Sequence, residues 1–529
     1  MKTVGRGHTA LPPSRLRGSG RAGEGGRASR RADGRACGRA GGRFSGARAA
    51  KRARRARRGM AGAAGAAAGA AAALWALRHG ARGGSRPGGR GGRGGQCIGE
   101  AAAPGTVSPG EAGRSTIGAP SPPGTSLRGG GRSRVRPGLE RLLRSAEARS
   151  EDVAEALGVL QGRRVGLVCN HTALTPGLEP ALEALLAEEE RLGFRIAAVF
   201  APEHGFRGAA QAGESGRDTA CGDVSVHSIY GLRGETLARA FRDAGVDALV
   251  YDIQDVGCRF YTYVWTLYDC MEVAGHMPVV VLDRPNPLGG DVVAGPVLQP
   301  SHSSFVGRAP IALRHGMTTG ELAGLFAGDF LEDPPQLCVV RVGGLKRAAT
   351  WEETGLPWVA PSPNMPGPQT ARVYPGVGLL EGTNVSEGRG TTQPFELLGA
   401  PWVDERLALE LRARAAAGCI RGADFREAHF VPAFGKHAGL PVRGVQVYVT
   451  DVEHFDPALL GAHLLVLLRS LYPGKFAWTG NGFIDKLAGD ARLREAVDGG
   501  AQPEELAAQW EGGLRRFRRA RRQHLLYPS

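Results

Sequence analysis

The sequence predicts an α/β protein with a Rossmann-like, doubly wound, mainly parallel sheet domain, a smaller C-terminal α/β domain and a disordered basic tail in front of both. From about residue 139, short apolar runs rich in valine alternate with longer amphipathic segments, which is typical of strands and helices in turn. Several of the apolar runs end in polar motifs, as parallel strands do at a binding edge. We therefore expect a tail at 1–138, a Rossmann-like domain at 139–370 and a smaller domain at 371–529 that completes a cleft.

The first domain is expected to contain six strands and four helices. Each strand is a short apolar run bounded by turn residues: Arg164–Cys169, Ile196–Phe200, Ser225–Tyr230, Ala248–Asp252, Val279–Leu282 and Leu337–Val342. The helices are the longer amphipathic segments: Leu178–Leu192, Glu235–Ala244, Tyr261–Ala274 and Thr318–Phe326. Gly245 is a typical C-terminal stop for the second helix, and Thr318 with Glu321 forms a capping box for the last.

A long stretch rich in proline, glycine and aromatic residues, Trp351–Trp402, separates the two parts. It shows little periodicity, and an irregular stretch of this length inside a compact protein is usually functional. The elements expected beyond it are a strand at Val445–Thr450 and helices at Glu405–Ala417, Pro457–Tyr472 and Leu506–Arg522.

The net charge of +16 belongs to the tail. Residues 1–138 hold 28 Lys and Arg against 4 Asp and Glu, which leaves 39 of the 67 basic and 47 of the 51 acidic residues to 139–529. The folded core is therefore mildly acidic, and we expect it to bind no nucleic acid. The tail is too poor in large apolar residues to form a core. Its G-x-G-x-x-G at residues 89–94 lacks the flanking strand and helix of a dinucleotide site.

One part of the tail, 51–80, resembles a degenerate targeting segment. A basic run at Lys51–Arg58 precedes Met60 and a small-residue run that contains no acid. If this segment acts as a signal, the protein is secreted or organellar; otherwise it is cytoplasmic. The small-residue run is too rich in alanine and glycine for a membrane span, so stable membrane insertion is not expected.

The sequence points to chemistry without a metal or cofactor. It contains eight cysteines but no C-x-x-C, and no H-E-x-x-H, Walker A or G-x-S-x-G motif. The oligomeric state is left open by the sequence.

Three of the expected strands end in clusters of polar residues. Because parallel strands carry their carboxyl ends to one edge of the sheet, these clusters are expected to form a shared site, with unrelated ion-paired turns as the alternative. The clusters supply nine candidate site residues: Glu203, His204, Asp252, Gln254, Asp255, Arg259, Tyr261, Asp283 and Asn286.

A fourth cluster lies in the loop from Tyr374 to Thr391. It combines carboxylates, an amide, a guanidinium and hydroxyls with glycines that allow close approach to a ligand, which suits a polyhydroxylated substrate. The candidates are Tyr374, Glu381, Asn384, Glu387 and Arg389. In the alternative interpretation, Glu387 and Arg389 pair with each other and only hold the loop.

Two carboxyl groups in one site are typical of glycoside hydrolysis. Glu203 is the preferred acid because Phe200, Ala201 and Phe206 flank it, and burial favours the protonated form of a carboxyl group. The second carboxylate is left open among four residues, with Asp252 and Glu387 as the leading choices: Asp252, Asp255, Glu381 and Glu387. His204 is expected to be a hydrogen-bonding partner rather than a metal ligand.

Six motifs resemble the bacterial exo-β-N-acetylmuramidase family of the NamZ type. They occur in the family's order and cover about 150–527: F-A-P-E-H-G-F-R-G (200–208), D-I-Q-D-V-G-C-R-F-Y-T-Y (252–263), L-D-R-P-N-P-L-G-G (282–290), R-H-G-M-T-T-G-E-L-A (314–323), P-S-P-N-M-P (361–366) and E-G-T-N-V-S-E-G-R-G-T-T (381–392). The resemblance implies a Rossmann-like domain, a smaller α/β domain and a cleft between them.

The resemblance also implies an activity, which is the release of N-acetylmuramic acid from the non-reducing end of peptidoglycan fragments. The family's proposed catalytic glutamate corresponds to Glu203, and Asn364 in the fifth motif is expected to bind substrate. The lactyl carboxylate of the sugar needs a cation, for which Arg259 and Arg389 are the candidates. The alternative function is a module that binds a cell-wall sugar or a nucleotide without turnover.

Overall fold

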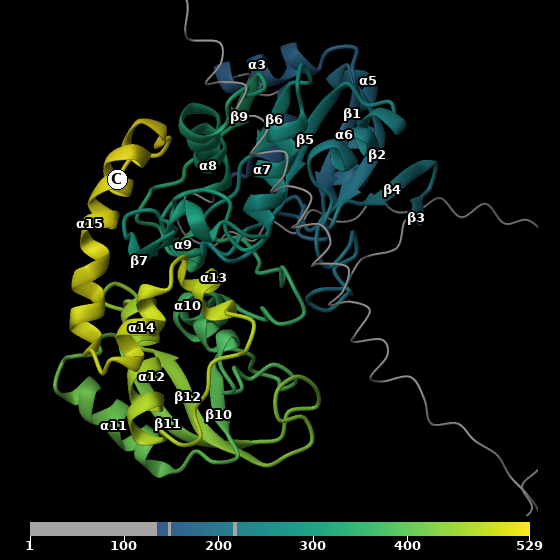
Figure 1. Ribbon diagram of the computed structural model, residues 1–529. Coiled ribbons are helices and arrows are strands. Elements are labelled where there is room, and N and C mark those ends of the chain that lie inside the picture. Colours follow the sequence, from purple (N-terminus) through teal and green to yellow (C-terminus); the bar gives the residue numbers. More distant parts are fainter. Residues whose placement is uncertain (1–134, 147–149, 215–218) are drawn as a thin grey trace, which may run out of the picture. The chain divides into compact units, whose positions relative to one another are not determined.

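A seven-stranded sheet forms the centre of the first part of the protein (Figure 1). The computed structural model describes residues 135–146, 150–214 and 219–529, so residues 1–134 of the expected disordered tail at 1–138, with its targeting segment at 51–80, lie outside the described residues. The strands run across the sheet in the order β3-β4-β2-β1-β5-β6-β9. Their bounds are β1 Arg164–Cys169, β2 Arg195–Ala201, β3 Thr219–Cys221, β4 Val224–Ser228, β5 Ala248–Asp252, β6 Val279–Leu282 and β9 Leu337–Val340.

Every neighbouring pair in this sheet is parallel except β3 with β4. The chain starts at β1, proceeds outward through β2 and β4, and then returns to the other side of β1 with β5, β6 and β9. This order confirms the predicted doubly wound α/β fold. It also places the topological switch point between β1 and β5, where such sheets bind ligands beyond the carboxyl ends of the strands.

Both faces of the sheet are buried, because successive strand residues enter two different cores. In β5, Ala248 and Val250 join one core, whereas Leu249 and Tyr251 join the other. The first core is completed by α2 Gly138–Leu143, α3 Glu151–Leu160, α4 Ala181–Ala187 and α5 Glu189–Leu192. The second is completed by α6 Gly234–Asp243, α7 Tyr263–Val273 and α8 Thr319–Leu325. The single helix expected at Leu178–Leu192 is therefore two helices, separated at Glu188.

A second, three-stranded antiparallel sheet has the strand order β10-β12-β11. Its strands are β10 Leu397–Ala400, β11 Ala423–Phe430 and β12 Val442–Val449, and β11 is an element that the sequence did not predict. The helices of this part are α10 Pro368–Val377, α11 Glu405–Ala416, α12 Pro457–Leu471, α13 Phe483–Ala488, α14 Arg492–Asp498 and α15 Pro503–Arg521.

The stretch expected to be irregular, 351–402, contains two α-helices, a 3-10 helix and a strand. They are α9 (Trp351–Thr354), α10, the 3-10 helix Gly378–Gly382 and β10. Helix α10 was missed because Pro368 at its start and Pro375 inside it resemble loop residues. Proline is tolerated in the first turn of a helix, where its missing N–H would have no partner in any case.

The last helix returns to the first part of the chain. Helix α15, the yellow helix at the C-terminal end in Figure 1, packs on β7 (Ala294–Val297) and β8 (Ala312–Arg314). Its Arg521 donates from Nη1 to the carbonyl oxygens of Gly290 (2.8 Å) and Gly316 (2.6 Å). The domain boundary at residue 370 stays a prediction. Within the described part of the chain, no helix is both long enough and apolar enough to cross a bilayer.

Candidate active site

A cavity of about 250 Å³ opens beyond the carboxyl end of β2. It is near the lower end of the size range of small-ligand pockets, roughly 300–1,000 Å³. Residues from both the first and the second part of the chain line it, so both parts contribute to its wall. Six of the residues predicted from sequence lie in its wall: Glu203, His204, Tyr261, Tyr374, Glu381 and Arg389.

Glu203 follows β2 directly, and hydrogen bonds hold its carboxylate in the cavity wall. Oε1 accepts from the backbone N–H of Gly213 at 2.9 Å, and Oε2 accepts from the hydroxyl of Thr262 at 2.7 Å. Burial raises the pKa of the neighbouring Tyr230, and the Glu203 carboxylate adds to that rise. The tyrosine therefore stays a neutral hydrogen-bond donor toward Glu203. Glu203 is 8% exposed, and its immediate surroundings are more polar than the flanking phenylalanines led us to expect.

His204 is held in an unusual backbone conformation. Its φ of 70° lies in the left-handed region, which is uncommon for a residue with a side chain. Its Nδ1 lies 2.8 Å from the carbonyl oxygen of Ala210, and because a carbonyl only accepts, Nδ1 carries the proton. This contact agrees with the predicted role of a hydrogen-bonding partner. Backbone strain of this kind clusters at functional sites.

Glu381 and Arg389 line the same cavity as an ion pair. Oε1 of Glu381 accepts from Nε of Arg389 at 3.0 Å and from Nη2 at 2.8 Å. Burial raises the pKa of Glu381, and Arg389 opposes that rise. Burial alone would lower the pKa of Arg389, but the carboxylate of Glu381, together with Tyr374 and Glu387, holds it above its usual value. The guanidinium thus remains charged inside the cavity.

Glu387 lies behind Arg389 and is not among the lining residues. Its Oε1 is 3.6 Å from Nε of Arg389, and its Oε2 is 2.9 Å from Nζ of Lys436. Lys436 also donates to the carbonyl oxygens of Leu380 (2.7 Å) and Val385 (3.0 Å). Glu387 therefore contacts Arg389 and Lys436 instead of lining the cavity, a geometry that fits the alternative in which Glu387 and Arg389 hold the loop.

Aromatic rings make up much of the remaining wall. Tyr374 packs edge-on against Phe260 and Phe395, with ring centroids 5.0 and 4.6 Å apart. Phe305 and Phe483 lie nearly parallel, with an interplanar angle of 10° and centroids 6.3 Å apart. Phe305 is 42% exposed, which places this pair at the mouth of the cavity. Such rings offer broad apolar faces to the ring of a sugar.

Asp252 does not reach the cavity, which corrects its selection as a catalytic carboxylate. It is fully buried at the end of β5 and pairs with Arg284 through two hydrogen bonds, Nε to Oδ1 at 2.5 Å and Nη2 to Oδ2 at 2.9 Å. Arg284 also donates to the carbonyl oxygen of Leu174 at 2.9 Å. The pair joins β5 to neighbouring loops inside the protein, so its geometry is that of a structural ion pair.

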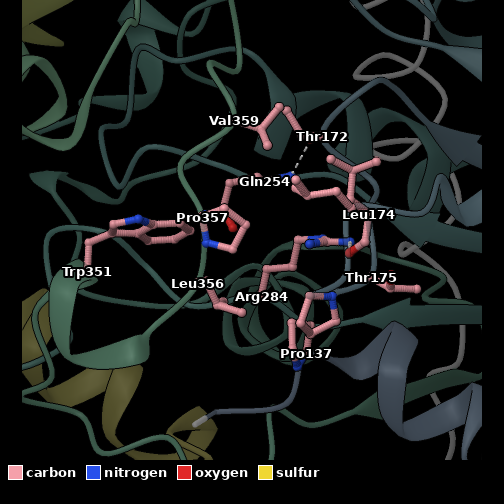
Figure 2. Close-up of a pocket in the computed structure, with 12 residues that line it drawn as sticks. Pro137, Thr172, Leu174, Thr175, Gln254, Arg284, Trp351, Leu356, Pro357 and Val359 are labelled. Atoms are coloured by element: carbon pink, nitrogen blue, oxygen red, sulfur yellow. Dashed lines mark hydrogen bonds between the residues drawn. The ribbon is translucent and has the colours of Figure 1, made fainter. Parts of the chain in front are cut away.

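Gln254 likewise faces away from the cavity. Its Nε2 donates to the carbonyl oxygens of Asp255 and Pro285, both at 2.8 Å. Figure 2 shows Gln254 and Arg284 in a different pocket, where a dashed line marks the bond from the Gln254 backbone N–H to the Thr172 hydroxyl. That pocket has a volume of about 30 Å³, which is room for about one water molecule and not for a sugar.

Arg259 is also a structural residue rather than a cation for the substrate. It is fully buried and donates to the carbonyl oxygens of Pro296, Ile311 and Leu487. Burial lowers its pKa to about 10, so it remains charged at neutral pH. Its side chain links β7, the residue before β8 and α13, and Arg389 is left as the only one of the two predicted arginines in the cavity wall.

Asp283 and Asn286 tie the end of β6 to distant segments. Asp283 accepts from Thr318 Oγ1 at 2.7 Å, from the backbone N–H of Gly320 at 2.8 Å and from the Tyr527 hydroxyl at 2.5 Å. Asn286 donates from Nδ2 to the carbonyl oxygen of Met317 and accepts from the N–H of Leu288. Neither lines the cavity, so contact of either residue with substrate stays a prediction.

The buried Asp283 predicts a pH dependence of stability. Burial raises its pKa from 3.8 to about 6, so between these values the folded protein keeps a proton that the unfolded chain releases. The free energy of unfolding is therefore expected to fall as pH rises from about 4 to about 6, by about 2–3 kcal/mol from this group. Asp283→Asn should remove that slope. The test is urea unfolding of both proteins at several pH values. The exposed Asp291→Asn serves as a control, and a wild-type-to-Asp283→Asn difference that stays constant with pH would contradict the prediction.

Three further predicted residues lie outside the cavity. Asp255 accepts from the N–H of Gly257 and lies 3.7 Å from His315. Asn384 is held by backbone groups of Lys475 and Ala477. Asn364 donates to Gln211 Oε1 at 3.2 Å, and only its neighbours Ser362 and Met365 line the cavity. Asn364 thus lies next to lining residues without lining the cavity itself, whereas Asp255 and Asn384 form hydrogen bonds with backbone groups of loops.

Several residues of the cavity were missed from the sequence: Tyr230, Thr262, Phe305 and Phe483. Tyr230 closes one of the expected strands, so the strand-end rule applied to that strand would have found it. Thr262 follows the predicted Tyr261. Nothing in the local sequence marks Phe305 or Phe483, because only the tertiary fold brings their rings together.

The described residues contain no group of three or more His, Cys, Asp and Glu side chains arranged to hold a metal ion. Models of the two domains of exo-β-N-acetylmuramidase NamZ match the chain, the N-terminal model at residues 165–369 and the C-terminal model at 372–527.

Proteins with known names or structures also match. The chain is 42% identical over 373 residues to peptidoglycan β-N-acetylmuramidase NamZ of Bacillus subtilis (strain 168), covering 70% of this chain and 88% of that protein. Two crystal structures of DUF1343 family proteins from Bacteroides fragilis are similar. One has a TM-score of 0.65 and 30% identity over 74% of this chain and 99% of that one. The other has a TM-score of 0.57 and 28% identity over 75% and 100%.

Proposed function

This chain belongs to the exo-β-N-acetylmuramidase NamZ family and is a glycosidase, and we propose that it releases N-acetylmuramic acid from peptidoglycan fragments with Glu203 as the general acid. The observation that carries the assignment of the acid is the position of Glu203, which follows β2 and lines the same cavity as Glu381 and Arg389. Glycoside hydrolysis typically requires one carboxyl group as the acid and a second carboxylate in the same site.

Hydrogen bonds orient the carboxyl group of Glu203 for the proposed role as the acid. Thr262 and Gly213 fix the orientation of the carboxyl group, so that its proton can be aimed at the glycosidic oxygen. In the proposed step Glu203 gives its proton to that oxygen, the bond from the anomeric carbon to the oxygen breaks, and the leaving sugar departs with a hydroxyl group. The oxygen of a water molecule then ends on the anomeric carbon, and the proton that this water loses returns to a carboxylate of the enzyme, which completes the hydrolysis.

Glu381 is the proposed second carboxylate. Among the four candidates from the sequence it lines the cavity, whereas Asp252 is paired with Arg284 in the interior. Its pair with Arg389 favours the ionised form that can stabilise positive charge at the anomeric carbon.

Arg389 is the proposed partner of the lactyl carboxylate, which distinguishes N-acetylmuramic acid from N-acetylglucosamine. Its Nε and Nη2 donate to Glu381, and its Nη1 has no hydrogen-bond partner among the described residues. Nη1 is therefore available to bind the carboxylate of the ligand. The rings of Phe305 and Phe483 at the mouth are suited to the leaving sugar, since an exo-acting enzyme holds the terminal sugar at the inner end.

The function is tested by comparing two disaccharides that differ in the sugar at the non-reducing end. With N-acetylmuramic acid there, the free sugar is expected to appear, and with N-acetylglucosamine in its place little should be released. Chromatography of the products measures both. Saturable binding without release would instead indicate a binding module and would contradict the proposed activity.

The role of Arg389 is tested with a chromogenic N-acetylmuramide and its lactyl amide, in which the carboxylate is neutral. For wild type, kcat/KM should be about ten- to a hundredfold higher for the acid than for the lactyl amide, which is the usual contribution of a hydrogen bond to a charged group. Arg389→Gln should lose most of this preference, whatever its overall activity. Arg372→Gln, which removes an arginine paired with Glu352 outside the cavity, is the matched control. An unchanged preference in Arg389→Gln would exclude Arg389 as the partner of the lactyl group.

A further inference from the structure

The loop between β11 and β12, residues 431–441, packs on the loop at 380–390 that forms part of the cavity wall. The backbone N–H of Ala433 donates to the carbonyl oxygen of Gly390 at 2.8 Å, and His437 donates from Nε2 to the carbonyl oxygen of Asn384, also at 2.8 Å. At Gly390, whose φ is 82°, a Cβ atom would lie 2.4 Å from a backbone oxygen of the β11–β12 loop. The two loops are therefore in direct backbone contact.

Lys436 is the charged residue with which the β11–β12 loop holds the 380–390 loop. Its Nζ donates to the carbonyl oxygens of Leu380 at 2.7 Å and Val385 at 3.0 Å, and to Oε2 of Glu387 at 2.9 Å. An ammonium group carries three protons, so these partners occupy all of its donors. The charge of Lys436 is thus fixed beside the cavity wall, although the residue does not line the cavity.

Side chains of alternating charge lead from this lysine to the cavity. Lys436 contacts Glu387, and Oε1 of Glu387 lies 3.6 Å from Nε of Arg389. Arg389 in turn donates from Nε and Nη2 to Glu381. Because all these side chains are at least partly buried, water screens their charges incompletely. At an effective dielectric constant of about 20, one unit charge at such distances changes the pKa of a nearby group by about one unit or more.

The charged neighbours of Glu381 act on its carboxyl group with opposite signs. Burial raises the pKa of Glu381, and the adjacent Arg389 lowers it. Glu387 raises this pKa as a like charge, whereas Lys436 lowers it. The charges of Glu387 and Lys436 therefore oppose each other at Glu381, and the loss of either one disturbs this balance.

Other titratable groups near Glu381 do not affect a comparison between variants. Tyr374 and Cys258 stay neutral, because burial raises the pKa of each well above its usual value. Glu203 in the same cavity and His437 in the β11–β12 loop also titrate, but both are unchanged in the variants described below.

We propose that Lys436 is a positioning residue of the glycosidase, which neutralises Glu387 and so keeps the guanidinium beside Glu381. Without the ammonium group, the buried carboxylate of Glu387 competes with Glu381 for Arg389, and Glu381 then takes up a proton more readily. The inference rests on the proposed function, in which Glu381 is the second carboxylate.

The test is the pH dependence of kcat/KM on the lactyl amide of a chromogenic N-acetylmuramide, which has no carboxylate of its own to titrate. Its good leaving group needs little protonation, so the acidic limb of the profile reports the second carboxylate. Lys436→Met should move this limb to higher pH by about one unit, because it removes an opposite charge. Glu387→Gln should move it to lower pH, because it removes a like charge. The double variant should lie between the two single variants.

Opposite movements are the result that a merely structural role would not produce. Lys346→Met, at an exposed lysine outside the cavity, is the matched control and should leave the profile unchanged. An unmoved limb in Lys436→Met, or movement of both single variants in the same direction, would overturn the proposal. If circular dichroism shows that Lys436→Met does not fold, Glu387→Gln carries the test, and an unmoved limb there would overturn it. A wild type that releases no sugar would overturn the proposed function and this inference together, whereas these outcomes with an active wild type overturn the inference alone.

Discussion

Replacing Glu203 by glutamine is expected to reduce kcat on a disaccharide about 10²- to 10⁴-fold, the usual contribution of a general acid. Glutamine can accept from the N–H of Gly213 through its amide oxygen and donate from its NH2 group to the hydroxyl oxygen of Thr262, so the loss should come from the missing proton and not from a collapsed site. An aryl glycoside with a good leaving group should lose much less, because its departure needs little protonation. Steady-state kinetics on both substrates, with the folded state checked by circular dichroism, measures the difference.

Glu235→Gln provides the matched control, because its side chain on α6 is 82% exposed and lies outside the cavity. Near-wild-type turnover of the disaccharide by Glu203→Gln would remove Glu203 from the acid role. An equal loss on both substrates would instead point to a carboxylate that acts as a base or nucleophile.

Breaking the Asp252–Arg284 pair is expected to destabilise the protein by about 3–5 kcal/mol, because either single substitution leaves a buried charge without its partner. Burial already raises the pKa of Asp252, and Arg284 is what opposes that rise. Asp252→Asn and Arg284→Met should each lower the midpoint of urea unfolding. The double variant should be more stable than the less stable single variant, because it leaves neither charge alone.

The same variants distinguish a structural from a catalytic role for Asp252. At a temperature where Asp252→Asn is folded, its kcat is expected to stay within about threefold of wild type, since Asp252 does not line the cavity. A large fall in kcat with unchanged stability would instead indicate a catalytic role for Asp252. Wild-type stability in both single variants would contradict the buried ion pair.

Much of the fold could be predicted from local patterns. The six parallel strands were located because each is a short apolar run, and both faces of the sheet are buried as such runs require. The elements that were missed carry misleading local signals. Helix α10 contains two prolines. Strand β11 (Ala423–Phe430) contains three charged side chains and a histidine, although its alternation of buried and exposed residues is typical of a strand with one buried face.

The candidate site was predicted less completely than the fold. The strand-end rule identified Glu203 and His204 after β2, and the glycine-rich loop identified Glu381 and Arg389. The rule failed for Asp252 after β5. A residue's position at a strand end is a property of the local sequence, but its access to the ligand depends on which other group occupies its hydrogen bonds.

By itself, the sequence determined the family, the doubly wound sheet and the strand end that carries Glu203, because these depend on motifs and periodicity along the chain. Only the tertiary structure decided which polar residues meet in the cavity. Tyr527, from the end of the chain, takes the carboxylate of Asp283, and the carbonyl oxygens of three separate segments surround Arg259. Burial makes such partners obligatory, since an unpaired polar group in the interior is costly. Partners so distant in sequence leave no local pattern that would reveal them.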